Sequence, residues 1–365
     1  MKILFLGDYS GLHACIAAEL RRKGHDVTVV SDSGAFMKTP ADIQLSRTPG
    51  MKGGIAYLFR LFNLLPQMKG YDVVQLVNAN FLALKPGKIK YFFDILKREN
   101  GAIHLTLAGD DHFFVKACAD AKMFRFSEYK VGDQPTQMTR EDPERMYGWI
   151  SDANHRWSEY LYKNIDGAIS VLPEYDMAAR PILGDRLTFT NLPVDLSTLP
   201  YSPLEISGPI KLFIGMKSSM AVQKGTDRLL ETAKKIERDM PGKVITECVR
   251  DLSLKDYLTH MRDAHIVLDQ LYSYSPATNA LQAMALGKVA ATGAQPEYFD
   301  YLGMNAADSP IIGLSPLEDP EPALRSLIEN PKKLIEMGRK GRELVERHNS
   351  VENIAPLWMK SWQKS

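Results

Sequence analysis

Two lysines in the second half of the chain have the residue type and placement to bind an anion. Lys217 directly follows the apolar run 211–216, and Lys224 precedes Gly225 at the start of a helical pattern. Ammonium groups beside a strand end and a helix N-terminus suit a diphosphate, because free backbone N–H groups and the helix dipole favour negative charge at the same point. The simpler alternative is a pair of solvated loop lysines, and the lysines alone leave it open.

A polar loop followed by a helix start lies further along the same half. The apolar run 264–271 ends in this loop, and a helical pattern begins just after Pro276. Proline at a helix start with polar residues in the first turn fits an N-terminus directed at an anion, although a well-capped core helix would give the same pattern. The residues expected to face the anion are Ser275, Ala277, Thr278 and Asn279.

The first glycine turn of the chain is another candidate anion site. The run Gly7 to Gly11 joins an apolar strand pattern to a helical pattern that contains His13. We take Gly11 and His13 as substrate-binding candidates, and a tight turn without a ligand is the alternative. The dinucleotide fingerprint G-x-G-x-x-G is absent here, which argues against a dinucleotide oxidoreductase.

Short β-rich runs alternate with longer helical patterns along the whole chain, which predicts an α/β protein with parallel sheets covered by helices. The Pro- and Ser-rich segment 191–209 separates two series of strands, so we place the first domain at 1–200 and the second at 201–348. The predicted strands span 2–8, 26–32, 72–77, 102–109, 167–173, 187–193, 211–216, 243–249, 264–271, 288–294 and 310–314.

Composition and charge narrow the classes of partner and compartment. The net charge is +1 over 365 residues, which argues against nucleic acid as a partner. The opening apolar run stops at Asp8, too early for a signal peptide, and no run reaches the length of a membrane span. The three cysteines show neither disulfide nor zinc spacing, so we expect reduced thiols in a cytoplasmic protein.

Several segments, in order, resemble one enzyme family. DQLY, LQAMALGK and TG within 264–293 resemble the donor-site signature of the retaining GT-B glycosyltransferases often called family 4. GHDVTVV, GAISVLPEY, NLPVD, QKGTDRLL and the tail from ENPKKLIEMGRKG resemble further segments of that family. The resemblance implies a GT-B fold, in which two Rossmann-like domains with parallel sheets face each other across a cleft, and it implies that the last helix, 349–365, crosses back to the first domain.

The resemblance also implies an activity. A hexosyltransferase-like enzyme of this family moves a sugar, with retention, from a nucleotide-diphosphate sugar to a saccharide or lipid-linked saccharide acceptor, in polysaccharide or glycolipid synthesis. It binds the donor on the second domain and the acceptor on the first, and it needs no metal ion or other cofactor. By position in the family motif, Lys217 and Lys224 would hold the donor diphosphate.

The chain departs from the family at two donor-site positions. The family has two glutamates eight positions apart, of which the first contacts the donor sugar and the second the ribose. Tyr274 and Gln282 stand at these positions here. Gln282 can still form hydrogen bonds to a ribose hydroxyl but carries no charge. These departures keep open the alternative of a nucleotide-sugar-binding protein without catalysis. A nucleotide-sugar epimerase on the same fold is a second alternative.

Three polar residues follow the run 102–109 within AGDDHFF, which resembles a family segment facing the sugar. Asp110, Asp111 and His112 are therefore the catalytic candidates, able to orient an acceptor or the leaving sugar. The alternative is a helix N-cap with aspartate in its first turn.

Two stretches predict a peripheral contact with the inner face of a membrane. The segment 54–70 is a very apolar helix, and 85–98 mixes lysines with Tyr91, Phe92 and Phe93. Basic residues beside aromatic ones suit an anionic surface or a lipid-linked acceptor. Buried helix faces with lysines extending to solvent are the alternative.

Overall fold

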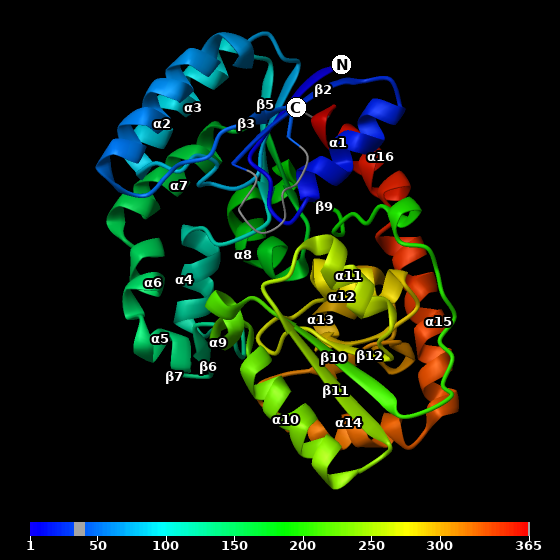
Figure 1. The fold of residues 1–365 in the computed structure, drawn as a ribbon. Helices are drawn as coiled ribbons and strands as arrows, with labels where there is room; N and C mark the ends of the chain where they lie inside the picture. The colour runs from blue at the N-terminus through cyan, green and yellow to red at the C-terminus, as the bar shows by residue number, and fades with distance from the viewer. Residues whose placement is uncertain (33–40, 364–365) are drawn as a thin grey trace. The chain divides into compact units, whose positions relative to one another are not determined.

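The computed structural model describes residues 1–32 and 41–363, which form two compact units (Figure 1). Unit 1 comprises Met1–Lys116, Tyr147–Pro193 and Val351–Ser365, and unit 2 comprises Ala117–Met146 and Val194–Ser350. These limits differ from a division at residue 200, because segment 117–146 packs with the second half of the chain.

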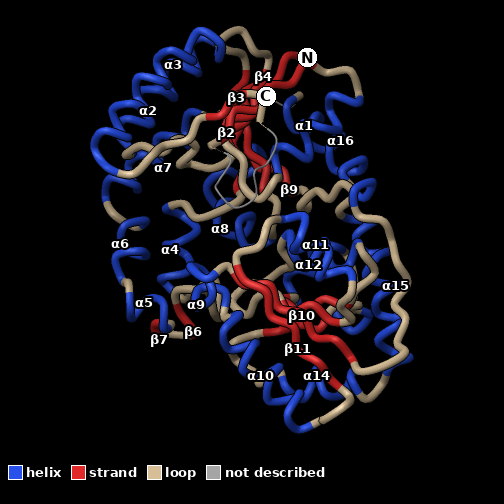
Figure 2. The backbone as a smooth tube through the Cα atoms, viewed as in Figure 1, coloured by secondary structure: helices blue, strands red, loops and turns tan. Residues whose placement is uncertain are grey.

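A sheet of parallel strands in the order β3-β2-β1-β4-β5-β8-β9 forms the centre of unit 1 (Figure 2). The order changes direction at β1, with β2 on one side and β4 on the other, so the topological switch point lies between β1 and β4. The strands are β1 (Lys2–Leu6), β2 (Asp26–Ser31), β3 (Ile43–Gln44), β4 (Val73–Leu76), β5 (Ala102–Leu107), β8 (Gly167–Ser170) and β9 (Leu187–Phe189). The helices are α1 (Leu12–Arg22), α2 (Gly50–Leu64), α3 (Pro86–Glu99), α7 (Asp152–Asn164), α8 (Pro173–Leu183) and α16 (Val351–Trp362).

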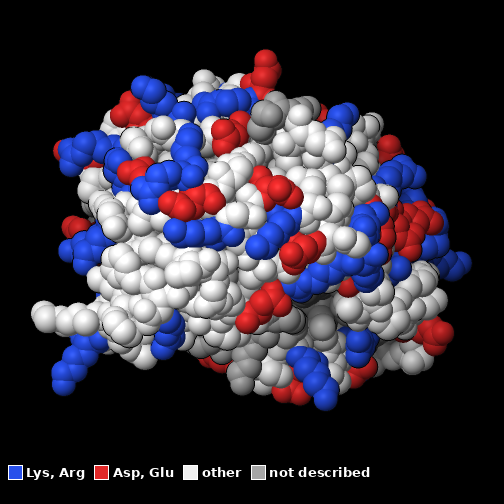
Figure 3. Space-filling model, turned by 90° about the horizontal axis from the view of Figure 1, so that it is seen from above, with Lys and Arg blue, Asp and Glu red and all other residues white. Residues whose placement is uncertain are grey.

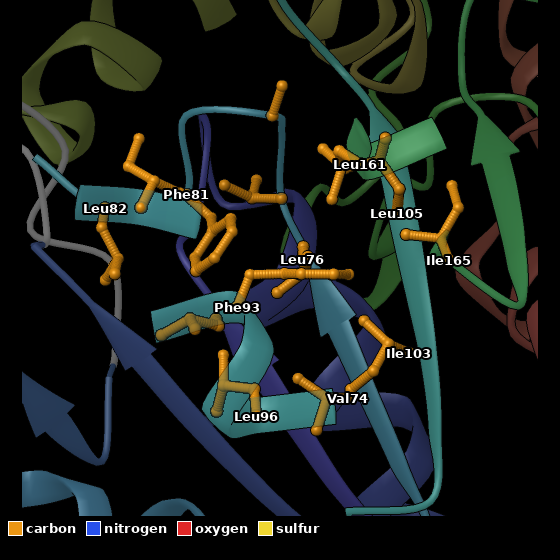
Figure 4. Close-up of a cluster of buried hydrophobic side chains, with 14 of the residues drawn as sticks. Val74, Leu76, Phe81, Leu82, Phe93, Leu96, Ile103, Leu105, Leu161 and Ile165 are labelled. Carbon is orange, nitrogen blue, oxygen red and sulfur yellow. The ribbon is translucent and has the colours of Figure 1, made fainter. Parts of the chain in front are cut away.

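The core of unit 1 lies between the sheet and its covering helices. Side chains of β4 and β5, such as Val74 and Ile103, pack with Phe93 of α3 and Leu161 of α7 (Figure 4). A parallel sheet with helices on its faces buries both sides of its strands, which explains the continuous apolar runs in the sequence.

Helix α16 completes unit 1 through its tryptophans. It lies beside α1, where Figure 1 shows the red end of the chain next to the blue start. The indole N–H of Trp358 donates to Thr190 Oγ1 at 3.1 Å, and that of Trp362 donates to Gln75 Oε1 at 2.8 Å. Both indole rings are buried, so the C-terminal helix is part of the unit 1 core.

Unit 2 contains a second parallel sheet, with the order β11-β10-β12-β13-β14. Its strands are β10 (Ile210–Met216), β11 (Val244–Arg250), β12 (Ile266–Leu268), β13 (Val289–Gly293) and β14 (Ile312–Leu314). Its helices are α5 (Gln137–Glu141), α9 (Ala221–Lys224), α10 (Thr226–Asp239), α11 (Leu254–Arg262), α12 (Thr278–Ala285), α13 (Pro296–Leu302), α14 (Glu321–Ile328) and α15 (Pro331–His348). The short strands β6 (Lys130–Val131) and β7 (Gln134–Pro135) form a separate antiparallel pair.

Two elements change unit along the chain. Helices α4 (His112–Asp120) and α6 (Pro143–Trp149) contain the points at which segment 117–146 leaves and re-enters unit 1. Within residues 1–32 and 41–363, no helix is long and apolar enough to cross a membrane. On the face shown in Figure 3, Lys and Arg side chains are interspersed with Asp and Glu rather than gathered by sign.

Candidate functional site

The switch point of the unit 2 sheet brings several predicted residues to one edge. The strand order reverses between β10 and β12, and ligands of open α/β sheets bind at the carboxyl ends of strands at such a point. Lys217 follows β10, and Asp269 follows β12. The topology of the unit 2 sheet therefore makes this edge a candidate ligand-binding position.

Lys224, Asp269 and Asn279 form a connected polar group at this edge. The Lys224 ammonium lies 3.8 Å from Asp269 Oδ1, and Asn279 Nδ2 donates to the same oxygen at 3.0 Å. Tyr257 donates its hydroxyl hydrogen to Asn279 Oδ1 at 2.6 Å, and burial raises the pKa of Tyr257 well above its usual value. Asp269 is buried, whereas about a third of the Lys224 side chain remains exposed at 34%, so the ammonium can reach a ligand.

Two glycines allow this close packing. Gly225 has φ +70°, and a Cβ atom there would lie 2.8 Å from Leu271 Cβ, so the turn after Lys224 needs glycine. The Lys224 carbonyl accepts from the Leu271 N–H at 2.8 Å, which joins this turn to the loop after β12. At Gly215, a Cβ would overlap the Tyr257 ring, so glycine also gives Tyr257 its place beside β10.

Helix α12 presents a polar stripe and an uncapped N-terminus. Ala277 is its N-cap residue and supplies no side-chain hydrogen bond, so the first N–H groups lack the cap that serine or aspartate would provide. Thr278, Asn279 and Gln282 are half-buried on one side of the helix, while Ala280 and Leu281 are buried. The predicted residues Thr278, Asn279 and Gln282 thus share a face.

Lys217 lies at the same edge but beside a different strand end. It is exposed and precedes the short turn Ser218–Met220. Hydrogen bonds from Ser218 lower the pKa of Asp251, which follows β11, and the positive charge of Lys217 contributes to the same shift.

Tyr274 and Ser275 are placed inside unit 2. The Tyr274 side chain is 2% exposed, its ring packs against Phe124 and Phe126, and its hydroxyl oxygen accepts from the Arg125 N–H at 2.6 Å. Arg125 also pairs with Glu297, which fastens segment 117–146 to the unit. These contacts favour a packing role for Tyr274 over contact with a donor sugar, and Ser275 is likewise fully buried.

In unit 1, the glycine turn after β1 contains the Asp8 carboxylate, which accepts a hydrogen bond from the first turn of α1. Gly11 has φ +79° and is the N-cap residue of α1. Oδ1 of Asp8 accepts from the His13 N–H at 2.9 Å, and the Leu12 N–H donates to the Tyr9 carbonyl at 3.0 Å. The first N–H groups of α1 are therefore engaged, which favours the alternative of a tight turn without a ligand at Gly11.

His13 is a neutral core residue. It is completely buried, and its Nδ1 lies 2.7 Å from the Gly7 carbonyl oxygen, to which it must donate. Its Nε2 lies 3.0 Å from Thr106 Oγ1, which also accepts from Gln75 Nε2 and so donates its own hydrogen to His13. Burial lowers the pKa of His13 to about 3. Since both ring nitrogens bind within the protein, the geometry favours a structural role.

Asp110, Asp111 and His112 lie together after β5, and two of them bind within unit 1. Asp111 is buried, and its Oδ1 accepts from the Phe114 N–H at 2.8 Å as an N-cap of α4, while its Oδ2 accepts from Tyr162. Burial raises the pKa of Asp111. The geometry of Asp111 therefore matches the N-cap alternative.

His112 is buried and stacks on His155, with ring centroids 4.5 Å apart. Burial lowers the pKa of His112, and its Nε2 has no hydrogen-bond partner among the residues described. Asp110 is half-buried, so of the three it is the residue whose side chain is most open to solvent.

Sequence reasoning missed the residues that orient the unit 2 site. Tyr257 fixes Asn279, yet a lone tyrosine in the pattern of α11 carries no signal for this role. Arg125 acts on Tyr274 across 149 positions of sequence, a contact that no local pattern can reveal. Across the described ranges, no group of three or more His, Cys, Asp or Glu side chains could hold a metal ion.

Comparisons with known proteins give the fold a name. No protein-family model matches the sequence, and no curated protein matches it. Among solved structures, sucrose-phosphate synthase from Thermosynechococcus elongatus is similar with a TM-score of 0.64 at 13% identity, covering 100% of this chain and 99% of that one. HepE from Anabaena, in complex with UDP and glucose, has a TM-score of 0.62 at 15% identity, with both chains covered completely.

A further similar structure is WaaG, a glycosyltransferase involved in lipopolysaccharide biosynthesis, with a TM-score of 0.58 at 14% identity, covering 97% of this chain and 98% of that one. These similarities extend over the whole chain, and the two parallel sheets agree with them. The predicted fold class is therefore confirmed: the chain has the GT-B fold of these glycosyltransferases.

Proposed function

We propose that the chain is a glycosyltransferase that moves a sugar from a nucleotide-diphosphate sugar to an acceptor. The observation that carries the proposal is the edge of the unit 2 sheet, where Lys224 lies beside Asp269 and the uncapped α12. A partly exposed ammonium and a helix N-terminus without a side-chain cap, both at a switch point, suit the diphosphate of a donor. HepE, which shares the fold, has been described with UDP and UDP-glucose, which supports this choice of ligand.

The residues of unit 2 would act on the leaving diphosphate. When the bond between the anomeric carbon and the phosphate oxygen breaks, negative charge develops on the diphosphate. Lys224, Lys217 and the N–H groups of Thr278 and Asn279 would stabilise that charge, and each well-placed donor lowers such a barrier by about 3–4 kcal/mol. Gln282, on the same face of α12, would form neutral hydrogen bonds to the ribose.

The finer assignments rest on the sequence resemblance. We propose retention at the anomeric carbon, a saccharide or lipid-linked saccharide acceptor bound by unit 1, and a place in polysaccharide or glycolipid synthesis. WaaG, with the same fold, is a glycosyltransferase involved in lipopolysaccharide biosynthesis, which supports this class of product.

We also propose that unit 1 contacts an anionic membrane surface from the cytoplasmic side. Helix α2 has two apolar stripes two residues apart, which lie on opposite faces of a helix. Tyr57 and Leu61 are buried, whereas Ile55 and Phe59 are 63% and 69% exposed. Residues 43–71 contain no Asp or Glu but include exposed lysine and arginine, so the exposed stripe has positive charge around it.

An epimerase is the second candidate function. A UDP-N-acetylglucosamine 2-epimerase from Listeria monocytogenes, described as putative in its own name, has a similar structure with a TM-score of 0.54 at 11% identity, covering 93% of this chain and 90% of that one. An epimerase would invert one stereocentre of the sugar and would not transfer the sugar to an acceptor, so the two activities give different products from the same donor.

The test is incubation of the purified protein with a panel of nucleotide sugars, beginning with UDP-glucose, with and without saccharide acceptors. Transfer or slow hydrolysis, with release of the nucleoside diphosphate, supports the proposal. A new epimeric nucleotide sugar formed without acceptor supports the epimerase. Thermal stabilisation by a donor without turnover of any kind would show a binding protein.

A further inference from the structure

Segment 117–146 contacts the rest of unit 2 at the two loops that flank the switch point of its sheet. One is the loop after β12, where the Tyr274 hydroxyl oxygen accepts from the Arg125 N–H at 2.6 Å. The other is the connection after β10, where α5 lies beside α9, the single helical turn that ends at Lys224 (Figure 1). The loops after β10 and β12, the two strands at which the order reverses, are therefore both fastened to one segment.

Gln223 makes the polar contact between α9 and this segment. Its side chain is buried, its Nε2 donates to Glu128 Oε2 at 2.7 Å, and its Oε1 accepts from the Arg145 guanidinium. A side-chain amide has one accepting oxygen and one donating nitrogen, so this orientation offers the oxygen to the cation and the nitrogen to the carboxylate. Glu128 precedes β6 and Arg145 lies in α6, so one buried side chain joins two separate parts of the segment to α9.

The position of α9 depends on such contacts, because one helical turn has little stability of its own. Helix α9 contains only four residues. The Lys224 carbonyl oxygen accepts from the Leu271 N–H at 2.8 Å, which fixes the end of the turn to the loop after β12. Neighbouring side chains of a helix diverge by about 100°, so Gln223 contacts the segment while the Lys224 ammonium lies near Asp269.

We infer that Gln223 is a positioning residue for donor binding, because it joins segment 117–146 to α9 and so holds Lys224 where the diphosphate binds. The contact of Lys224 with the diphosphate rests on the proposed function, whereas the link between the segment and α9 does not. Without the two hydrogen bonds of Gln223, α9 would sample other conformations. The apparent affinity for the donor then falls in proportion to the fraction of molecules in which α9 is in place.

The test measures the affinity of the full chain for UDP by calorimetry, with Gln223→Met as the principal variant. Methionine keeps the length of the side chain and removes both hydrogen bonds, so UDP should bind about fivefold more weakly. Glu128→Ala should have a similar effect, whereas Glu128→Gln, which still offers an oxygen to Gln223, should stay within about twofold of the wild type. Gln137→Met is the matched control, because Gln137 is an exposed glutamine of the same segment that bonds to Glu141 within α5.

Two further readouts distinguish the positioning of Lys224 from a general loss of structure. Combined with Lys224→Ala, Gln223→Met should change the affinity for UDP by less than about twofold, because the group that it positions is no longer present. Amide hydrogen exchange of residues 221–225, measured without nucleotide, should be faster in Gln223→Met and in Glu128→Ala than in the wild type. Exchange in β10, an inner strand of the sheet, should be unchanged in both variants.

Three results overturn the inference. They are an affinity of Gln223→Met for UDP equal to that of the wild type, an equally large effect of Gln223→Met in the Lys224→Ala background, and unchanged exchange of residues 221–225 in both variants. Loss of affinity in Lys224→Ala but not in Gln223→Met would overturn it and leave the proposed function intact. If the wild type does not bind UDP, the proposed function fails instead. Faster exchange of residues 221–225 in both variants then supports the link between the segment and α9, and unchanged exchange overturns it.

Discussion

The Lys224 ammonium lies 3.8 Å from Oδ1 of Asp269, a buried carboxylate that also accepts from Asn279. At that distance the pair is held by charge and not by a short hydrogen bond, so the ammonium can turn to an incoming diphosphate. The second oxygen of Asp269 is buried without a partner among the residues described. Asp269 thus positions both the cation and the first turn of α12.

Lys224→Ala should weaken binding of a nucleoside diphosphate such as UDP by about 1.5–3 kcal/mol, the scale of a hydrogen bond to a charged group. Calorimetry on the purified protein measures this change. Lys243→Ala is the control, because Lys243 is an exposed lysine that precedes β11, at the amino edge of the same sheet. Equal affinity of the Lys224 variant and the wild type would exclude Lys224 from the site.

Substitutions of Gln282 test the proposed neutral hydrogen bond to the ribose. Gln282→Met keeps the length of the side chain and removes both polar atoms, so UDP should bind more weakly by about 0.5–1.5 kcal/mol. Gln282→Glu should bind it more tightly by about 1 kcal/mol, because charged hydrogen bonds are stronger and α12 contains no acidic residue. If neither change alters affinity or turnover, Gln282 is a packing residue and the predicted register of the donor site is wrong.

Unit 1 should lose stability as the pH falls from about 6.5 towards 3. Burial lowers the pKa of His13 to about 3 and that of His104 to about 4, while both histidines take up a proton in the unfolded chain near pH 6.5. Below that pH the unfolded state binds more protons, so each histidine reduces the free energy of unfolding by about 1.4 kcal/mol per pH unit until the folded state is protonated.

Urea unfolding followed by tryptophan fluorescence measures this dependence, since the four tryptophans all report on unit 1. His13→Asn should be less stable at pH 7 by about 1–3 kcal/mol, because hydrogen bonds to Gly7 and Thr106 are altered. Its loss of stability on acidification should nevertheless be smaller than that of the wild type. An unchanged slope would show that His13 does not titrate as its burial requires.

Local pattern predicted most of the fold, because β-rich apolar runs and helical periodicity are local properties. Each predicted strand appears in the structure with ends that differ by a few residues. The strand β3 was missed because it contains two residues, Ile43 and Gln44, too few for any periodicity. The strands β6 and β7 were missed for the same reason.

The candidate site was predictable only where it depends on strand ends. That Lys224 and Asn279 lie near one edge of the unit 2 sheet could be predicted, because the segments that follow parallel strands meet at one edge; their role in donor binding stays a prediction. The glycine turn after β1 was predicted as an anion site, but the Asp8 carboxylate accepts from the His13 N–H there. This contact depends on the orientation of the Asp8 side chain, which cannot be predicted from a local sequence pattern. The burial of Tyr274 under segment 117–146 depends on contacts between residues far apart in the sequence.

Membrane binding is the last prediction, and it rests on the exposed stripe of α2. Met51 and Phe62, which are 85% and 49% exposed, continue the stripe formed by Ile55 and Phe59. The ring centroids of Phe62 and of Tyr91 in α3 are 6.3 Å apart. Large apolar side chains in a row are unfavourable in water and gain about 1.5–3 kcal/mol each when fully buried. Exposed lysines and arginines around them add about 1 kcal/mol each near an anionic surface.

The protein should therefore co-sediment with vesicles that contain phosphatidylglycerol, and less with neutral phosphatidylcholine vesicles or at high salt. The double variant Ile55→Ser, Phe59→Ser should reduce this binding about tenfold or more without changing the thermal stability, because both side chains are already exposed. Leu357→Ser on α16, exposed at 41%, is the matched control. The prediction is wrong if the protein binds equally and negligibly to both kinds of vesicle, or if the double variant binds vesicles as well as the wild type does.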